Sequence, residues 1–217
     1  LFEFIWLQAR PKRVTEFVSL SPAARETLLT ARGTQGLLSF SPHLGNWELG
    51  NLALNHAGIH TAAVARKQPN PFIQRLIERQ RLSFGGRIIW EKGAAKGILK
   101  ALKQKELVMI LVDQNTKPHA GGIFVDFFGL PAAMSRAPAM FARRTGARLV
   151  MATCIRREDG SYAIELGELS QPVAEFPTDE EVCAEINRMT EDLIRRYPEQ
   201  YIWMYGRYRY IPSNWEG

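Results

Sequence analysis

The stretch Phe40-Ser41-Pro42-His43-Leu44-Gly45-Asn46-Trp47-Glu48-Leu49-Gly50 marks a passage from a buried strand to a helix. An apolar run, Leu37 to Phe40, precedes it. Gly45-Asn46 suits a sharp bend, and Asn46 suits the N-cap of the helix that follows. A strand, a turn and a helix in this order are typical of ligand sites at the carboxyl ends of strands in α/β sheets.

His43 and Glu48 are the candidate catalytic pair. On one continuous helix five residues rotate the chain by roughly 500°, which would place the two side chains about 140° apart. With His43 in the loop and Glu48 in the first helical turn, the imidazole and the carboxylate can meet. The carboxylate would keep one ring nitrogen protonated and leave the other free as a base for an alcohol or amine nucleophile. The alternative is that both residues are only structural.

The composition is that of a soluble globular protein of one α/β-sized domain. The 217 residues are 46% hydrophobic and 23% charged, with a net charge of +6, which favours acidic partners. The two cysteines, Cys154 and Cys183, have no spacing that indicates a zinc site or a disulfide framework, so a reducing compartment is expected. No apolar run reaches the roughly 18 residues of a membrane span.

The first residues suggest a piece of a longer protein, because the chain opens on Leu1 rather than Met. Residues 1–30 are predicted to be helical and to lie near a membrane, with an anchor upstream of residue 1. The apolar segment from Leu1 to Gln8 is either a core-packing helix or a helix at a membrane surface.

Alternating strands and helices predict one α/β domain over residues 1–217, with a mixed, largely parallel central sheet flanked by helices. The expected strands are 36–41, 60–65, 87–90, 107–112, 148–155, 162–166 and 202–205, and residues 121–129 form a strand or an extended loop. The expected helices are 22–33, 46–57, 70 onward, 94–102, 137–144 and 178–197. Ser21 is the expected N-cap of the first, with Pro22 at its first position, and Thr178-x-x-Glu181 is the capping box that opens the last. In the helix from Asn70, the residues expected to face inward are Phe72, Ile73, Leu76 and Ile77. Its basic face (Arg75, Arg79 and Arg81) is either solvated or docks an acidic carrier or lipid headgroups.

Several blocks in order resemble the lipid A biosynthesis acyltransferase family (the lauroyl and myristoyl transferases), within the wider glycerophospholipid-type acyltransferases. The blocks are His43-Leu44-Gly45-Asn46-Trp47-Glu48, Arg66, Val112-Asp113-Gln114, Phe124 to Ala132, Pro138 to Ala147, Tyr197 to Trp203 and Arg207-Tyr208-Arg209. Together they cover residues 32–212. Tyr205-Gly206 departs from the family's usual His-Arg, which puts any contact of that pair in doubt.

The resemblance implies acyl transfer from an acyl carrier protein thioester to a hydroxyl of an anionic lipid A precursor. The expected place is the cytoplasmic face of the bacterial inner membrane, and no metal or bound cofactor is expected. His43, held by Glu48, would be the base. Arg66 or the backbone N–H groups at Gly45 and Asn46 would stabilise the oxyanion. Asp113, Gln114 and Arg207 are further substrate-binding candidates.

Two rival functions remain open. One is an acyltransferase for another acceptor, such as a lysophospholipid, a glycolipid or an aminolipid. The other is a non-catalytic basic domain that binds lipid or nucleic acid. Nucleic acid is disfavoured as a partner because the aromatic residues lie mostly inside apolar runs rather than among exposed basic residues.

Overall fold

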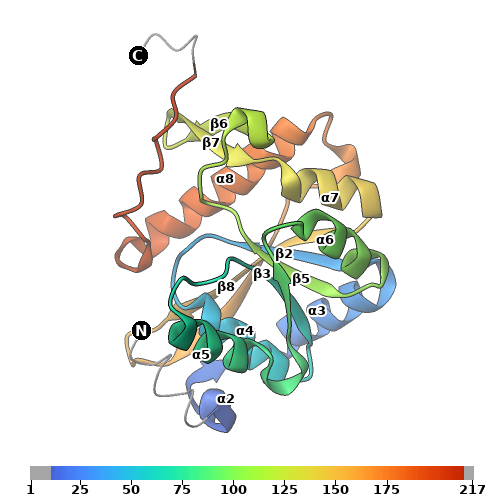
Figure 1. Cartoon of the computed structure of the whole chain (residues 1–217), viewed down its shortest axis with the longest axis vertical. Helices are drawn as coiled ribbons and strands as arrows, with labels where there is room; N and C mark the ends of the chain where they lie inside the picture. The colour runs from blue at the N-terminus through green and yellow to red at the C-terminus, as the bar shows by residue number, and fades with distance from the viewer. Residues whose placement is uncertain (1–10, 213–217) are drawn as a thin grey trace.

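The apolar run ahead of His43 forms a strand in the middle of the main sheet (Figure 1). The computed structural model describes residues 11–212. Within this range, seven strands form one sheet in the order β1-β9-β8-β2-β5-β3-β4, and β6 and β7 form a separate two-stranded sheet. The bounds are β1 (Val18–Ser19), β2 (Leu37–Ser41), β3 (Thr61–Ala65), β4 (Arg87–Trp90), β5 (Leu107–Leu111), β6 (Gly122–Phe127), β7 (Leu130–Ser135), β8 (Arg148–Arg156) and β9 (Tyr162–Glu168). Neighbouring strands of the main sheet run parallel except β8 and β9, which confirms the predicted mixed, largely parallel sheet.

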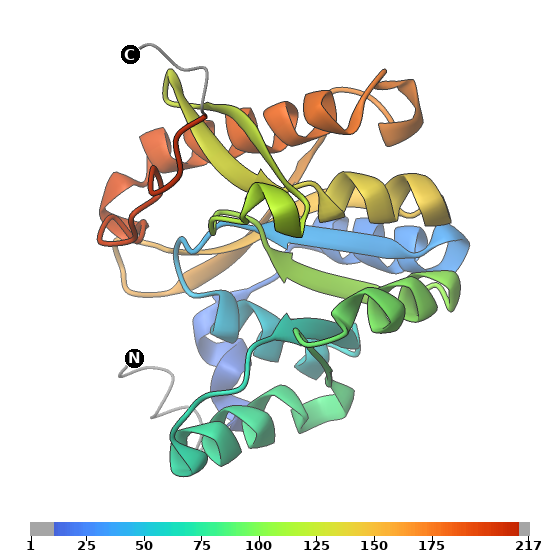
Figure 2. The same ribbon diagram turned by 45° about the horizontal axis from the view of Figure 1, so that its top comes forward.

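Helices cover both faces of this sheet, as Figure 2 shows. Their bounds are α2 (Val14–Phe17), α3 (Pro22–Gln35), α4 (Trp47–His56), α5 (Pro71–Arg81), α6 (Ala94–Lys103), α7 (Ala137–Thr145) and α8 (Asp179–Arg196). Strand β2 contributes to two cores because successive side chains of a strand point to opposite faces. Leu38 and Phe40 pack in the core under α6, α7 and α8. Leu37 packs on the other face, with residues of α2, α3 and α4.

The helix starts follow local capping chemistry. Ser21 Oγ accepts the Ala24 N–H at 3.1 Å, and Asn46 Oδ1 accepts the Leu49 N–H at 3.1 Å. Thr178 Oγ1 accepts the Glu181 N–H at 3.1 Å as the first half of the predicted capping box. These bonds satisfy amide groups that the first helical turn leaves without partners. The predicted caps at these three starts are confirmed.

Two expectations about secondary structure were wrong, and one strand was missed. Residues 202–205 form a turn rather than a strand, and Tyr201 makes only an isolated bridge with Leu44. The strand expected within 121–129 is β6, but β7, which follows after Phe128-Gly129 and pairs with β6, was not predicted. Between 11 and 30, α2 and α3 are separated by β1 at the edge of the sheet, so this part is not uniformly helical. The segment from Leu1 to Gln8 lies outside the described residues.

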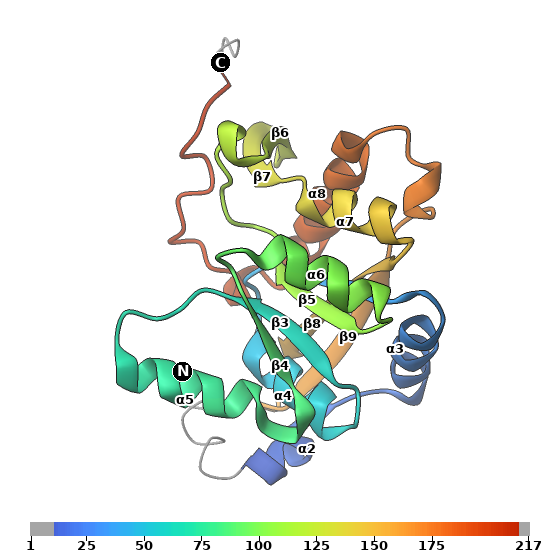
Figure 3. The ribbon, with the colours of Figure 1, turned by 45° about the vertical axis from the view of Figure 1, so that its right-hand side comes forward.

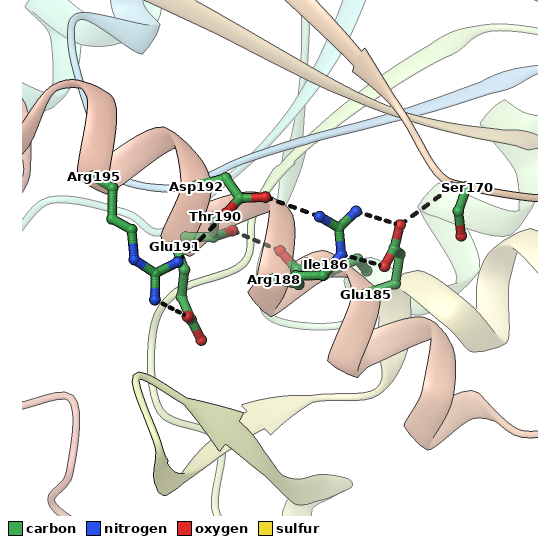
Figure 4. A network of polar contacts seen from close by, with 8 residues as sticks. All are labelled: Ser170, Glu185, Ile186, Arg188, Thr190, Glu191, Asp192 and Arg195. Carbon is green, nitrogen blue, oxygen red and sulfur yellow. Dashed lines mark hydrogen bonds and ion pairs between the residues drawn. The ribbon is translucent and has the colours of Figure 1, made fainter.

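The outer face of α8 carries a chain of ion pairs (Figure 4). Arg188 lies 2.8 Å from both Glu185 and Asp192, and Arg195 lies 2.9 Å from Glu191. The Arg188–Asp192 pair is exposed at both ends, and such exposed pairs add little stability one by one. Glu191 has a second contact, because its carboxylate accepts the Phe128 N–H at 2.8 Å and so ties the turn between β6 and β7 to α8.

Both cysteines are buried and free. Cys154 belongs to the core beside α4 and Cys183 to the core under α6, α7 and α8, so the sheet separates them. Burial raises the pKa of each thiol to about 12, which keeps both thiols protonated near neutral pH. Among residues 11–212, no helix combines the length and the apolar character that crossing a bilayer requires.

Helix α5 differs most from its predicted packing. Phe72, Ile73 and Leu76 were expected to face inward, but their side chains are 76%, 48% and 39% exposed. The residues that α5 turns inward include Gln80, which is buried, and Arg81, which is mostly buried. The apolar residues of α5 therefore face mainly outward.

Candidate active site

His43 and Asp113 meet because β2 and β5 are neighbouring parallel strands. Ser41, the last residue of β2, pairs with Leu111, the last residue of β5. Two further residues along each chain bring His43 opposite Asp113. Asp113 Oδ1 lies 2.6 Å from His43 Nδ1, and Asp113 Oδ2 accepts the His43 backbone N–H at 2.8 Å. One buried carboxylate therefore fixes both the ring and the main chain of the histidine.

The hydrogen bond at Nδ1 leaves the other ring nitrogen available as a base. An ionised carboxylate only accepts hydrogen bonds, so the Asp113 contact places the proton of a neutral imidazole on Nδ1. His43 Nε2 then carries a lone pair, and the Gln114 side-chain amide nitrogen lies 3.4 Å from it. Trp47 packs edge-on against the imidazole, with 4.8 Å between ring centroids. The imidazole is therefore held in place on two sides, with Nε2 able to accept a proton.

The backbone of the bend is fully engaged by neighbouring carbonyl groups. The Gly45 N–H donates to the Gln200 carbonyl at 3.1 Å, and the Asn46 N–H donates to the Cys154 carbonyl at 2.8 Å. Gly45 has φ +65°, and a Cβ there would lie 2.2 Å from the Cys154 carbonyl oxygen, so only glycine fits. The expectation that these two N–H groups stabilise an oxyanion is wrong, because both already have acceptors.

Glu48 is not the acid that holds the His43 ring. It lies in the first turn of α4, where the carboxylate is ion-paired with Arg81 of α5, and Arg81 Nε donates to Glu48 Oε2 at 3.1 Å. Both side chains are mostly buried, with 17% of Glu48 and 15% of Arg81 exposed. The predicted contact with His43 was wrong because Asp113 occupies Nδ1 while Glu48 is turned toward α5. Glu48 thus links the site helix to α5.

Arg66 is also engaged elsewhere. Its Nε and Nη2 donate to the Glu91 carboxylate at 2.7 and 2.9 Å, and its side chain is 75% exposed. The hydrogen bond with Glu91, followed by its negative charge, raises the pKa of Arg66. These hydrogen bonds of Arg66 go to Glu91 rather than to His43, while Tyr205 of the C-terminal segment lies within electrostatic reach of its guanidinium. The role of Arg66 at the oxyanion therefore stays a prediction.

The C-terminal segment covers the site from the other side. The Ile202 N–H donates to the His43 carbonyl at 3.3 Å, and Tyr201 lies close to Asp113. Burial raises the pKa of the Tyr201 hydroxyl, and the negative charge of Asp113 adds to this effect. Tyr201 therefore stays protonated and able to donate a hydrogen bond toward the carboxylate that orients the base.

Arg207 is the buried cation of the site, with 5% of the residue exposed. Burial lowers its pKa, and the nearby Tyr201 and Asp113 oppose that shift. Its Nη1 donates to Asn115 Oδ1 at 3.2 Å and to the Ala133 carbonyl. Its Nε and Nη2 are buried without a hydrogen-bond partner among the described residues. Buried guanidinium donors left unpaired are costly, so a ligand anion is their natural acceptor.

A cavity of about 480 Å³ adjoins this arginine. Its lining consists of Phe127, Phe128, Tyr201, Trp203, Tyr205, Gly206, Arg207, Tyr208 and Arg209. Aromatic walls around a few polar groups are typical of ligand sites. A larger cavity of about 580 Å³ lies at the other end of the sheet, beside Arg148 at the start of β8, and so does not adjoin His43.

Sequence reasoning missed Tyr201, Asn115 and the stacking of Trp47 on His43. Asn115 joins the strand end to the C-terminal segment, because its backbone N–H donates to the Tyr205 hydroxyl at 2.9 Å and its Nδ2 donates to the Gly206 carbonyl at 2.7 Å. Tyr205-Gly206, where the chain departs from the resembled pattern, thus has a positioning contact of its own. The sequence feature that could have identified Asn115 is its position directly after Asp113-Gln114 at the end of a buried strand.

Comparisons with known proteins identify the family and agree with the fold. A family model described as bacterial lipid A biosynthesis acyltransferase matches residues 25–210. A lipid A biosynthesis lauroyltransferase of Escherichia coli (strain K12) is 30% identical over 216 residues, which are 97% of this chain and 67% of that protein. A lipid A biosynthesis palmitoleoyltransferase of the same strain is 27% identical over 183 residues, 82% of this chain and 57% of that protein.

A more distant likeness supports the fold. The crystal structure of a 1-acyl-sn-glycerophosphate acyltransferase from Thermotoga maritima superimposes with a TM-score of 0.50 and 9% identity, over 91% of this chain and 82% of that one. A phosphatidylinositol mannoside acyltransferase of Mycobacterium tuberculosis (strain ATCC 25618 / H37Rv) is 31% identical over 121 residues, 52% of this chain and 36% of that protein. With a family model matched over most of its length, this chain belongs to the bacterial lipid A biosynthesis acyltransferase family.

Proposed function

We propose that the protein transfers a fatty acyl chain from an acyl carrier protein thioester to a hydroxyl of an anionic lipid A precursor. The observation that carries the proposal is the His43–Asp113 contact of 2.6 Å at the carboxyl ends of β2 and β5. It leaves His43 Nε2 open toward the side where Gln114 and the C-terminal segment lie. Membership of the family supports an acyl chain as the transferred group and a lipid A precursor as the proposed acceptor.

The chemistry needs one base and one site for developing charge. His43 Nε2 takes the proton of the acceptor hydroxyl as the oxygen attacks the thioester carbonyl carbon. The C–O bond forms, and the carbonyl oxygen becomes an oxyanion. When the C–S bond breaks, the leaving thiolate takes the proton from the imidazolium, giving the ester and the free thiol. Asp113 stabilises the imidazolium between these steps and stays ionised.

Gln114 is the oxyanion donor that the geometry favours. Its side-chain amide lies 3.4 Å from His43 Nε2 and is exposed, so it can turn toward a thioester carbonyl bound beside the base. One such donor is typically worth about 3–4 kcal/mol in the transition state. The N–H groups of Gly45 and Asn46 have other acceptors, whereas the Gln114 amide lies beside His43 Nε2.

Arg207 is proposed to hold an anionic group of the acceptor. Arg207 is one of the residues that line the aromatic cavity, in the segment that also covers His43, and its Nε and Nη2 are buried there without a hydrogen-bond partner among the described residues. A guanidinium offers parallel N–H groups that match the oxygen atoms of a phosphate. A phosphate bound there would place the acceptor's neighbouring hydroxyl on the His43 side of the C-terminal segment.

Replacing Arg207 by methionine is expected to raise the KM for a phosphorylated acceptor about 10- to 100-fold, because a charge-assisted hydrogen bond contributes about 1.5–3 kcal/mol. The decisive comparison is between the phosphorylated acceptor and its dephosphorylated form. Wild type should prefer the first, and Arg207→Met should lose most of that preference. An equal loss on both acceptors would show that Arg207 is only structural. Arg144→Met, at an exposed residue of the last turn of α7 and outside this cavity, is the matched control.

The expected partners follow from charge and from the class of acceptor. A net charge of +6 favours the acidic acyl carrier protein and an anionic membrane surface. We place the protein at the cytoplasmic face of the inner membrane, peripheral or anchored by a segment outside this chain. The acid–base steps use only the chain's own side chains, so the proposal assigns no metal or bound cofactor.

Incubation of the protein with an acyl carrier protein thioester and a lipid A precursor tests the proposal. The product should weigh the acceptor plus one acyl group less one water, and free thiol should appear in equal amount. Fragmentation of the product would identify the acylated position and the chain length. Failure to acylate, with each of several donor chain lengths, would refute the proposed reaction.

A second acceptor class is tested in parallel. The likeness to a phosphatidylinositol mannoside acyltransferase covers 52% of this chain and favours a glycolipid acceptor as the alternative. A panel containing a lipid A precursor, a mannosylated phosphoinositide and a lysophospholipid would separate these acceptors by kcat/KM. Preference for the mannosylated lipid would reassign the acceptor and leave the roles of His43 and Asp113 in place.

A further inference from the structure

The outward face of α5 combines apolar and cationic side chains. Phe72 is 76% exposed and Leu76 39% exposed, and both Arg75 and Arg79 are exposed. At 100° per residue these four side chains lie within an arc of roughly 100°. Ile73, 48% exposed, borders the arc. A helix with this face to solvent has the composition of helices that lie at the surface of an anionic bilayer.

A second exposed apolar cluster lies in the C-terminal segment. Trp203 is 60%, Met204 92% and Ile211 62% exposed, and Arg209 beside them is exposed as well. The Trp203 indole N–H donates to the Pro198 carbonyl at 2.7 Å, which satisfies its polar atom while much of the side chain stays exposed. Tryptophan with exposed apolar neighbours and an arginine is typical of the interface between membrane and water.

Both clusters flank the site. The Ile202 N–H bonds to the His43 carbonyl directly before Trp203 and Met204. The loop to the start of α5 leaves β3 at its carboxyl end, which is the edge of the sheet where His43 follows β2 and Asp113 follows β5. Figures 1 and 3 show the start of α5 and the C-terminal segment on the same side of the molecule, left in both views. The polypeptide between β3 and α5 also turns on that side (Figure 3).

We propose that this side of the molecule rests on an anionic lipid surface, with Phe72, Ile73 and Leu76 on one flank of the site and Trp203, Met204 and Ile211 on the other. The two clusters enter the interface, while Arg75, Arg79 and Arg209 meet the headgroups. His43 then opens toward the membrane between them. The proposal rests on the proposed function only in that the acceptor is a lipid.

A lipid surface fits these residues better than an acidic protein does. Docking of an acidic carrier requires cations above all, whereas the most exposed large side chains here are Met204 and Phe72. The apolar residues also come from two separate segments on either side of the site, which a planar surface can reach together. An acidic protein partner is therefore the competing outcome of the test.

Flotation with vesicles tests the proposal without any acyl donor or acceptor. The protein should bind vesicles of phosphatidylethanolamine and phosphatidylglycerol more strongly than vesicles of phosphatidylcholine alone. The double variant Phe72→Ser, Met204→Ser should partition to the anionic vesicles at least about 10-fold more weakly, since each serine removes apolar surface that the bilayer would bury. Leu82→Ser is the matched control, at the exposed C-cap of α5, about 15 Å along the helix axis from Phe72.

Two double variants, each of which removes two positive charges, measure the electrostatic contribution to vesicle binding. Arg75→Gln with Arg79→Gln should weaken binding to the anionic vesicles and reduce the salt dependence of that binding. Lys100→Gln with Lys103→Gln on α6 removes the same charge and should change vesicle binding little. Unchanged partition of Phe72→Ser, Met204→Ser would overturn the proposal. So would variants that keep vesicle binding but lose binding of the acyl carrier protein. Wild-type vesicle binding by a protein that acylates none of the acceptors would refute the proposed function and leave this inference standing.

Discussion

The variant His43→Ala is expected to lose about 10²- to 10⁴-fold in kcat, the range for removal of a general base. His43 Nε2 is the only atom to which the proposed mechanism assigns proton transfer from the acceptor. KM for both substrates should change far less, because the aromatic cavity and Arg207 remain. Steady-state rates with a saturating acyl carrier protein thioester measure the effect.

His119→Ala is the matched control, since His119 is exposed in the short 3-10 helix Pro118–Ala120. Circular dichroism of His43→Ala checks that the buried Asp113, left without its imidazole partner, has not unfolded the chain. A folded His43→Ala protein with wild-type kcat would remove His43 as the base.

The second prediction with a large expected effect distinguishes Asp113 from Glu48 as the acid that orients His43. Asp113→Asn is expected to lower kcat by about 10²- to 10⁴-fold, since a neutral amide accepts the Nδ1 hydrogen poorly and permits the wrong tautomer; the corresponding change in a serine protease costs about 10⁴-fold. The amide oxygen can still accept the His43 backbone N–H, so the loop should keep its shape. Kinetics of Asp113→Asn beside Glu48→Gln make the comparison.

Glu48→Gln should instead act on stability. It breaks the ion pair with Arg81 and is expected to lower the free energy of unfolding by about 1–3 kcal/mol while leaving kcat within a few-fold of wild type. Urea unfolding of the same preparations measures this change in the free energy of unfolding. The reverse pattern, an inactive but stable Glu48→Gln with an active Asp113→Asn, would restore Glu48 as the partner of His43.

Side-chain contacts of Asp113, Asn115 and Glu48 connect the site to the surrounding elements. Asp113 connects the base to β5, and Asn115 connects the end of β5 to Tyr205 and Gly206. Glu48 connects the first turn of α4 to α5. If α5 and the C-terminal segment rest on a lipid surface as we propose, each of these links joins a membrane contact to a residue beside the reacting groups.

The features that the sequence predicted are local ones. The order of strands and helices, the bend at Gly45 and the Asn46 cap depend on residues a few positions apart, and backbone geometry and capping chemistry fix them. The apolar run from Leu107 predicted a central buried strand, which β5 is. The sequence also identified His43, Asp113, Gln114 and Arg207 as candidate site residues, because each belongs to a block that resembles the family.

What only the tertiary structure decided was which of these residues meet. Glu48 is five residues from His43 and Asp113 seventy, yet the carboxylate on the ring belongs to Asp113, because the register of β2 against β5 places residue 113 opposite residue 43. Likewise, the periodicity of α5 shows an apolar stripe but not what covers it. The local sequence at the bend limits which side chains His43 can reach. The pairing of β2 with β5, which are far apart in the sequence, decides that Asp113 is its partner.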